Sequence, residues 1–167
     1  MPTCSVDRVT QITPQLLQLL GARAVILDVD NTLSPPESQR PFPGTVDWAQ
    51  QLTRLGFHLI IVSNNFRSRV APFAAQYGLP YICFAMKPLP LGYLRALHKL
   101  RVGRAQTVVV GDQIYTDIIG ANVVGFKSIL VTPLVKEESA SFLRRRRGEI
   151  PIRRKLKETG RHLSPKE

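Results

Sequence analysis

Two aspartates that stand two residues apart, directly after an apolar run, are the side chains of this chain best suited to chemistry. Asp28 and Asp30 follow residues 24–27, a run of Ala, Val, Ile and Leu that is typical of a strand buried in a parallel sheet. Because residues i and i+2 of an extended segment point the same way, both carboxylates could face one reacting group, one as nucleophile and the other as proton donor and acceptor. Taken alone, the pair fits a helix N-cap or an Asx-turn equally well.

Further polar side chains follow three other apolar runs that are expected to form strands. Each belongs to a polar cluster that follows its run, and together they are Ser63, Asn64, Lys87, Asp112 and Asp117. The carboxyl ends of parallel strands meet at one edge of a sheet, so we expect these side chains to converge with the first aspartate pair. Phosphoryl transfer to a carboxylate needs such a set: a nucleophile, an acid/base, donors for phosphoryl oxygens and carboxylates for Mg²⁺. Singly, each of them is an ordinary turn or surface residue.

The order of these motifs resembles the haloacid dehalogenase (HAD) superfamily of phosphohydrolases. The motifs are DxDNT at 28–32, SN at 63–64, KP at 87–88 and GDxxxxD at 111–117. Within that superfamily, the stretches DVDNTL, SNN and GDQIYTDIIG, with Ile-Thr-Pro ahead of the first strand, are similar to the YqeG-type subgroup and to related phosphatidylglycerophosphate phosphatases. The resemblance covers roughly residues 5–135.

The resemblance implies a catalytic role for each matching position. Asp28 would be the nucleophile that becomes an aspartyl-phosphate, and Asp30 would protonate the leaving alkoxide and then activate water. Ser63, Asn64 and Lys87 would bind the transferring phosphoryl group. An aspartate at position 30 further suggests a phosphatase rather than a dehalogenase or a P-type ATPase.

The resemblance also implies a Mg²⁺ site. Asp112 would hold the ion together with Asp28 and the backbone carbonyl of Asp30. Asp117 would orient Lys87 or a water on the metal. The supporting residues are Asn31, Thr32, Gln113 and Asp117, and the candidates for substrate contact are Asn65 and Arg67.

Apolar runs and helical patterns alternate along the chain. Strands are expected near 23–28, 57–62, 81–84, 107–110 and 127–131, and helices near 14–20, 45–55, 68–77, 90–101 and 115–123. This order predicts an α/β fold, a Rossmann-like, doubly wound sheet of about five parallel strands with helices on both faces. The segments 31–44 and 64–86 are too short to hold a cap domain, so we expect a capless HAD (subclass III) domain. Its site would be open, which suits a large substrate or a partner subunit that acts as a lid.

Positive charge is concentrated toward the C-terminus. The chain carries 23 Lys and Arg against 12 Asp and Glu, a net charge of +11, and residues 136–167 hold 11 of the basic and 5 of the acidic residues. We therefore divide the chain into a phosphatase domain, residues 1–135, and a basic C-terminal extension, residues 136–167. Four consecutive arginines at 144–147, ahead of a break expected at Pro151, would attract anionic lipid or nucleic acid. The scarcity of aromatic residues favours lipid, and a solvated, partly disordered extension is the alternative.

Composition agrees with a cytoplasmic enzyme. A chain of 167 residues, 44% of them hydrophobic, can bury one ordinary core. The sequence has no apolar run long enough to cross a bilayer and no secretion signal, and its two cysteines fit a reducing compartment. We expect the protein in the cytoplasm, attached peripherally to the inner face of the membrane through its basic extension.

The leading interpretation is a Mg²⁺-dependent phosphomonoester hydrolase that acts through an aspartyl-phosphate. Its substrate would be phosphatidylglycerophosphate, an anionic phospholipid, converted to phosphatidylglycerol and phosphate. Two alternatives remain open: a soluble HAD phosphatase for sugar, nucleotide or polynucleotide-end phosphates, and an HAD-fold nucleic-acid-binding or ribosome-associated protein. The sequence does not determine the oligomeric state.

Overall fold

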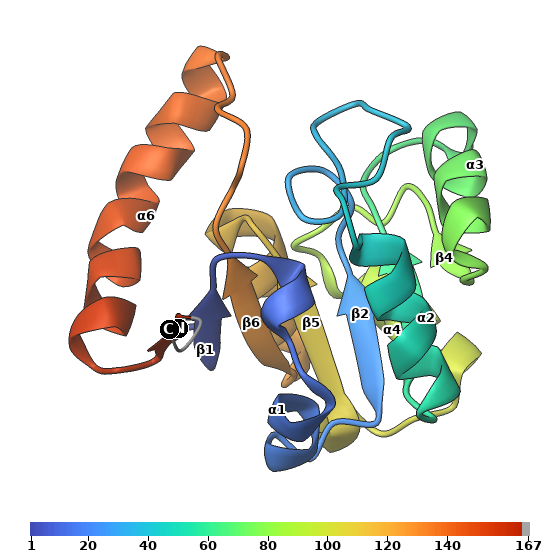
Figure 1. Cartoon of the computed structure of the whole chain (residues 1–167). Helices are drawn as coiled ribbons and strands as arrows, with labels where there is room; N and C mark the ends of the chain where they lie inside the picture. The colour runs from blue at the N-terminus through green and yellow to red at the C-terminus, as the bar shows by residue number, and fades with distance from the viewer. Residues whose placement is uncertain (165–167) are drawn as a thin grey trace.

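One parallel β-sheet organises the part of the chain that the structure, a computed structural model, describes, residues 1–164 (Figure 1). Within these residues the sheet has seven strands in the order β4-β3-β2-β5-β6-β1-β7. Their bounds are Cys4–Val6 (β1), Ala24–Leu27 (β2), His58–Val62 (β3), Tyr81–Ile82 (β4), Thr107–Gly111 (β5), Lys127–Val131 (β6) and His162–Leu163 (β7). The predicted doubly wound α/β fold is confirmed, with two strands more than expected.

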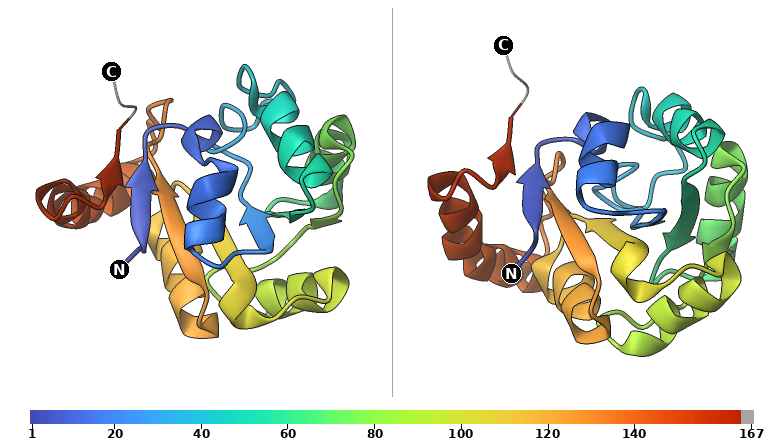
Figure 2. Two further views of the ribbon diagram at one scale, coloured as in Figure 1. Left: turned by 60° about the horizontal axis from the view of Figure 1, so that its bottom comes forward. Right: turned by 90° about the horizontal axis from the view of Figure 1, so that it is seen from below.

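Helices cover both faces of the sheet (Figure 2). They are Pro14–Leu19 (α1), Thr45–Arg54 (α2), Arg67–Tyr77 (α3), Pro90–Leu100 (α4), Ile119–Val124 (α5) and Ala140–Glu158 (α6), with single 3₁₀ turns at Val9–Gln11 and Arg104–Gln106 and a π-helical turn, η3, at Ile114–Ile118. The first three helices pack on one face, and α4, α5 and α6 pack on the other. None of the helices within residues 1–164 has both the length and the apolar composition to cross a membrane.

The central strands are buried on both faces, as their uninterrupted apolar sequences predict. In β2, Val25 and Leu27 join the core under α1, α2 and α3, while Ile26 joins the core under α4 and α5. Strand β2 pairs with β3 on one side and β5 on the other. The residues that follow β2 therefore emerge in the middle of the sheet's carboxyl edge, between the ends of two neighbouring strands.

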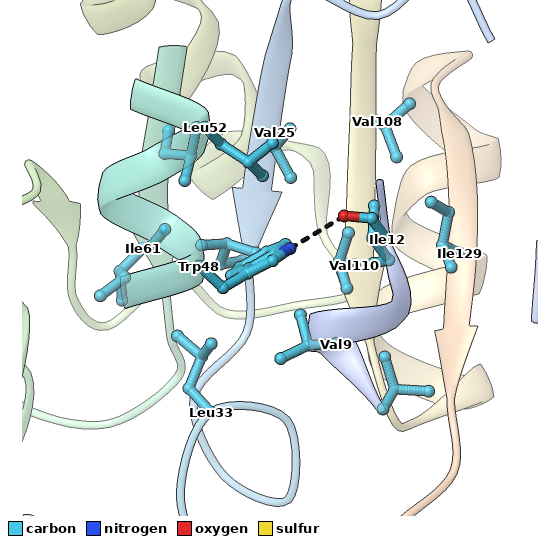
Figure 3. Close-up of a cluster of buried hydrophobic side chains, with 14 of the residues drawn as sticks. Val9, Ile12, Val25, Leu33, Trp48, Leu52, Ile61, Val108, Val110 and Ile129 are labelled. Atoms are coloured by element: carbon cyan, nitrogen blue, oxygen red, sulfur yellow. Dashed lines mark hydrogen bonds between the residues drawn. The ribbon is translucent and has the colours of Figure 1, made fainter. Parts of the chain in front are cut away.

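Trp48 lies in the core on the face of the sheet that α1, α2 and α3 cover (Figure 3). Its ring is buried in the core that also contains Val25, Leu52 and Ile61, and its Nε1 donates a hydrogen bond of 2.9 Å to the backbone carbonyl of Ile12. The one polar atom of this side chain is thus satisfied inside the core. The bond joins α2 to the segment that leads into α1.

The basic extension forms an ordered part of the same sheet domain. Helix α6 continues through Pro151, where the sequence predicts a break, because contacts on both sides of the proline hold it to the sheet. Leu156 packs on Ile114 and Leu130, and β7 pairs in parallel with β1. The alternative of a disordered extension is therefore wrong for the residues of α6 and β7, and the charge boundary at residue 135 does not separate two cores.

We expect Leu156→Ala to destabilise the fold by about 2–5 kcal/mol, because it removes a fully buried side chain between α6 and the sheet. Urea unfolding followed by circular dichroism measures this change. The matched control is Leu143→Ala on the same helix, where the side chain is 46% exposed and the expected effect is within about 0.5 kcal/mol. Equal, small effects of both substitutions would show that α6 does not pack against the sheet.

Candidate active site

A buried lysine bridges two aspartates at the carboxyl edge of the sheet. The Lys87 ammonium, from the loop between β4 and α4, lies 2.6 Å from Asp28 Oδ1 and 2.6 Å from Asp117 Oδ1. Asp28 follows β2, and Asp117 belongs to η3 after β5. Three segments that are distant in sequence thus converge on one ammonium group, at the edge where the sequence places them.

Asp112 completes a cluster of three buried carboxylates. One carboxylate oxygen each from Asp28, Asp112 and Asp117 lies within 4.8 Å of the other two. The Oδ1 atom of Asp112 is buried without a hydrogen-bond partner among the described residues. An unpaired buried carboxylate oxygen is costly, and a divalent cation would supply its missing partner. Hard oxygen donors in this number suit Mg²⁺, so the residues present fit the ion that the family resemblance implies.

Burial and like charge dominate the electrostatics of this cluster. Burial, together with the neighbouring Asp117 carboxylate, raises the pKa of Asp28 to about 7, against the opposing attraction of Lys87. Burial likewise raises the pKa of Asp112, which Arg146 opposes. Burial lowers the pKa of Lys87, but the charges of Asp117 and Asp28 outweigh this effect and hold that pKa well above its usual value. Lys87 is therefore a permanent cation among carboxylates that repel one another, an arrangement that a second cation would stabilise.

Asp30 lies beside this cluster and is held by a separate set of donors. Its Oδ2 accepts a hydrogen bond of 2.6 Å from the Asn65 amide, and its Oδ1 accepts from Arg69 at 2.9 Å and from the Glu37 backbone N–H at 3.0 Å. The side chain of Arg67 is exposed instead. Sequence reasoning singled out Arg67 and missed Arg69. The spacing of Arg69 could have identified it, because it stands one helical turn before Phe73, which is buried. Arg69 therefore lies on the inward side of α3, with its guanidinium over the Phe73 ring.

Ser63 and Asn64 have different tasks. The Ser63 hydroxyl is buried and accepts a hydrogen bond of 3.1 Å from the Asn65 N–H, which leaves its own proton to donate to a ligand. The Asn64 amide binds the backbone of Lys87 at both ends, with Oδ1 accepting at 2.7 Å and Nδ2 donating at 3.1 Å. Asn64 therefore positions Lys87, and the second N–H of its Nδ2 is still free to donate to a phosphate, so its predicted role in phosphate binding stays a prediction.

The other supporting residues brace the loops around the site. Asn31 exchanges two hydrogen bonds with the backbone of Val135, at 2.9 and 3.0 Å, and so holds the loop after β6 against the loop after β2. The Gln113 backbone binds Asp117, since its N–H donates to Oδ2 at 3.2 Å and its carbonyl accepts from the Asp117 N–H at 3.0 Å. The Thr32 hydroxyl is buried without a partner among the described residues.

Helix α6 reaches the site through an ion cluster. Arg146 pairs with the Asp112 carboxylate, and Arg146 and Arg153 both donate to the Asp112 backbone carbonyl, at 2.8 and 2.7 Å. Buried Glu149 accepts from both arginines and from the Ile114 N–H. The motifs of the sequence predict no site residue in the basic extension. A run of arginines is typical of a solvated surface, and no sequence pattern joins position 146 to position 112.

A cavity of about 490 Å³ opens over these groups. Asp28, Asp30, Ser63 and Lys87 line its base, and the loop segments 35–37 and 135–139 with the first turns of α6 form its wall. The wall is therefore built from short segments of the same domain. A cavity of this size could accommodate a phosphoryl group beside the aspartates together with more of a substrate.

Comparison with known proteins gives the family. Residues 34–125 match the model for haloacid dehalogenase-like hydrolases. The chain is 32% identical, over 96% of its length and 93% of the other protein, to probable phosphatase YqeG of Bacillus subtilis. It is 26% identical, over 91% of its length, to phosphatidylglycerophosphate phosphatase 1 of Arabidopsis thaliana, of which it covers 47%. A haloacid dehalogenase-like hydrolase of Bacteroides fragilis shares the fold with a TM-score of 0.61 at 15% identity, over 72% and 91% of the two chains.

The chain belongs to the haloacid dehalogenase-like hydrolase family. The family resemblance noted in the sequence is thereby confirmed, and so is the expected enzyme class, a phosphatase. The individual roles of the aspartates, the serine and the lysine remain predictions that mutation can test.

Asp28→Asn should lower kcat for any phosphomonoester by about a thousandfold or more, because an amide oxygen is a poor nucleophile toward phosphorus. Phosphate release measures the loss, and an unchanged circular dichroism spectrum shows that the fold is kept. A well-folded Asp28→Asn protein that retains more than about a few per cent of the activity would contradict the nucleophile assignment.

Arg69→Ala should lower kcat by about ten- to a hundredfold, because Asp30 loses a charged donor that orients its carboxylate. Arg69→Lys should recover part of the loss, since a lysine restores the charge without the planar fork. The matched control is Arg95→Ala, at an exposed position of α4, which should leave kcat unchanged. Equal rates for Arg69→Ala and the control would remove Arg69 from the site.

Proposed function

We propose that this member of the haloacid dehalogenase-like hydrolase family is a Mg²⁺-dependent phosphomonoesterase that forms an aspartyl-phosphate on Asp28. The observation that supports this most strongly is the Lys87 ammonium held between Asp28 and Asp117 beside the unpaired oxygen of Asp112. A nucleophile, a fixed positive charge and a place for a divalent cation then lie within one buried cluster.

In the first half-reaction an Asp28 carboxylate oxygen attacks the phosphorus atom and the P–O bond to the leaving group breaks. The leaving alkoxide takes a proton from Asp30, whose orientation Asn65 and Arg69 fix. In the second, a water oxygen attacks the same phosphorus while Asp30 takes the water proton, and the bond to Asp28 breaks. Asp28 and Asp30 return to their starting states, so the net reaction is hydrolysis of one ester bond.

The phosphoryl oxygens need donors in both half-reactions. Ser63 can donate its hydroxyl proton, because that oxygen already accepts a bond from the Asn65 N–H. Lys87 adds a fixed charge at Asp28, and the Asn64 amide keeps its backbone in place. Preorganised donors of this kind stabilise charge that develops on transferring phosphoryl groups.

The carboxylate cluster would hold Mg²⁺ through Asp28, Asp112 and Asp117. The backbone carbonyl of Asp30 would add a further oxygen ligand. When bound, the ion neutralises phosphoryl charge and reduces repulsion between the substrate and the Asp28 carboxylate. Arg146 occupies Asp112 Oδ2, so Oδ1 is the atom of Asp112 left for the ion.

We further propose phosphatidylglycerophosphate as the substrate and phosphatidylglycerol as the product, at the cytoplasmic face of a membrane. The similarity to the Arabidopsis phosphatidylglycerophosphate phosphatase supports this substrate. Lys136 and Arg145 line the cavity wall beside Glu137 and Glu138, and these two cations could bind a second phosphate of the substrate. In the arginine run, Arg144 and Arg147 are exposed and could face anionic lipid, whereas Arg146 is committed to Asp112.

A panel of phosphomonoesters should give the highest kcat/KM for phosphatidylglycerophosphate in mixed micelles, by about tenfold or more over glycerol 3-phosphate, sugar phosphates, nucleotides and 5′-phosphorylated oligonucleotides. Phosphate release is the measurement for every compound. A soluble ester hydrolysed as well as the lipid would instead favour a soluble phosphatase.

Chelation with EDTA should abolish turnover, and added Mg²⁺ should restore it, because the buried carboxylates then regain their cation. Asp112→Asn should raise the Mg²⁺ concentration for half-maximal activity by about tenfold or more. Independently of turnover, Mg²⁺ should raise the melting temperature of the wild type more than that of Asp112→Asn. Full activity in excess EDTA, or a requirement for Zn²⁺, would contradict the proposed metal.

A further inference from the structure

Four large apolar side chains are exposed on the two loops that also carry Asn65 and Lys87, residues that line the cavity. They are Phe66 (69% exposed), Phe84 (54%), Met86 (40%) and Leu89 (56%), and we call them the apolar rim. The rings of Phe66 and Phe84 are stacked with 5.6 Å between their centroids. The Phe84 N–H also donates to the Asn65 carbonyl at 2.8 Å, so the two loops that carry the rim are joined.

The rim is built into the same loops as the candidate catalytic groups. Phe66 directly follows Asn65, which binds Asp30, and Met86 directly precedes Lys87, which binds Asp28. Both loops follow strands, β3 and β4, so they lie at the carboxyl edge of the sheet (Figure 1). Other residues line the cavity itself. The rim therefore flanks the surface through which a substrate must enter.

The backbone that presents the rim is strained. Phe84 and Met86 have φ angles of 48° and 53°, in the left-handed region that bulky side chains rarely adopt. Glycine or asparagine would occupy these positions with less strain. Both residues are thus unfavourable in two respects: their backbone has a positive φ angle, and their large apolar side chains are exposed to water. Such departures cluster at functional surfaces.

The stretch of chain that carries the rim has basic residues and no acidic ones. Residues 48–111, which include α3, β4 and α4, contain no Asp or Glu. Their basic residues are Arg54, Arg67, Arg69, Lys87, Arg95, Lys99, Arg101 and Arg104. Arg67 is exposed next to Phe66, and Arg95 and Lys99 are exposed on α4. Exposed aromatic and aliphatic side chains with basic neighbours suit the headgroup layer of an anionic bilayer.

We propose that the apolar rim inserts into the headgroup layer of an anionic bilayer and thereby faces the cavity toward phosphorylated headgroups. The proposal rests on the proposed function, since a substrate in a membrane requires the site to face it. It assigns docking to the loops after β3 and β4, in addition to the exposed arginines of α6. The rim supplies insertion, and the basic residues supply attraction to the surface.

A tryptophan reporter tests insertion directly. The chain has one tryptophan, Trp48, which is buried, so its fluorescence should not respond to vesicles. Phe84→Trp adds an exposed tryptophan whose emission can report insertion. On vesicles of phosphatidylcholine and phosphatidylglycerol, its emission should shift to the blue and be quenched by brominated lipids. The matched control is Leu55→Trp at the end of α2, an exposed position (57%) at the opposite edge of the sheet, which should show neither change.

Removing the stacked rings tests their contribution. Phe66→Ser with Phe84→Ser should weaken partitioning onto these vesicles by about tenfold or more. It should leave kcat/KM for p-nitrophenyl phosphate unchanged, because neither ring lines the cavity. The control pair, Leu19→Ser with Leu55→Ser, removes exposed apolar side chains (84% and 57%) from the opposite edge and should change neither quantity.

Three results would overturn the proposal. The wild-type protein could fail to bind anionic vesicles, or the serine variants could bind them as well as the wild type does. The third is that the only change in the serine variants is the loss of a dimer, measured by sedimentation velocity. Binding can be measured with inactive Asp28→Asn protein, so it does not depend on turnover. Rim-dependent binding without hydrolysis of phosphatidylglycerophosphate would reject the proposed substrate and support the docking surface.

Discussion

The ammonium of Lys87 is the group on which the candidate site depends. Three carboxylates are buried within 4.8 Å of one another, and such a cluster repels itself unless cations lie inside it. Lys87 pairs with two of them, Asp28 and Asp117, at 2.6 Å each. Loss of one partner from a buried pair typically costs about 3–5 kcal/mol, because the remaining charge is left buried and unpaired, so removal of Lys87 would leave two buried carboxylates without their cation. The Asn64 amide binds both polar atoms of the Lys87 backbone. The position of Lys87 therefore depends on the contact between the loops after β3 and β4.

Asp112, the third carboxylate, is held by a different part of the chain. Arg146 and Arg153 of α6 bind its backbone carbonyl, and Arg146 also pairs with its carboxylate. Glu149, itself buried, accepts from both arginines and satisfies the backbone at the start of η3. The basic C-terminal helix therefore contributes to the geometry of the proposed metal site. Its positive charge has a structural use at this point, whatever its exposed arginines bind.

Much of this arrangement could be predicted from the sequence, because apolar runs followed by polar residues mark the carboxyl edge of a parallel sheet. That signal locates Asp28 and Lys87 correctly relative to one another. It misses β1 and β7, which have three and two residues and are too short for a periodic pattern. It also ends β4 too late, because Phe84 turns into the left-handed region. Long-range ion pairs such as Arg146 with Asp112 leave no local trace at all, so the ordered helix α6 and its role were not predictable.

The covalent intermediate of the proposed reaction can be located on the protein itself. Asp30→Asn protein, mixed with substrate and quenched in acid, should carry one phosphoryl group on the peptide that contains Asp28, because the base that would complete hydrolysis is missing. Peptide mass spectrometry identifies the site, and hydroxylamine should remove the group, as expected of an acyl phosphate. A phosphoryl group on Ser63 or elsewhere, or turnover in the wild type with no labelled peptide in either protein, would contradict the assignment of Asp28 as the nucleophile.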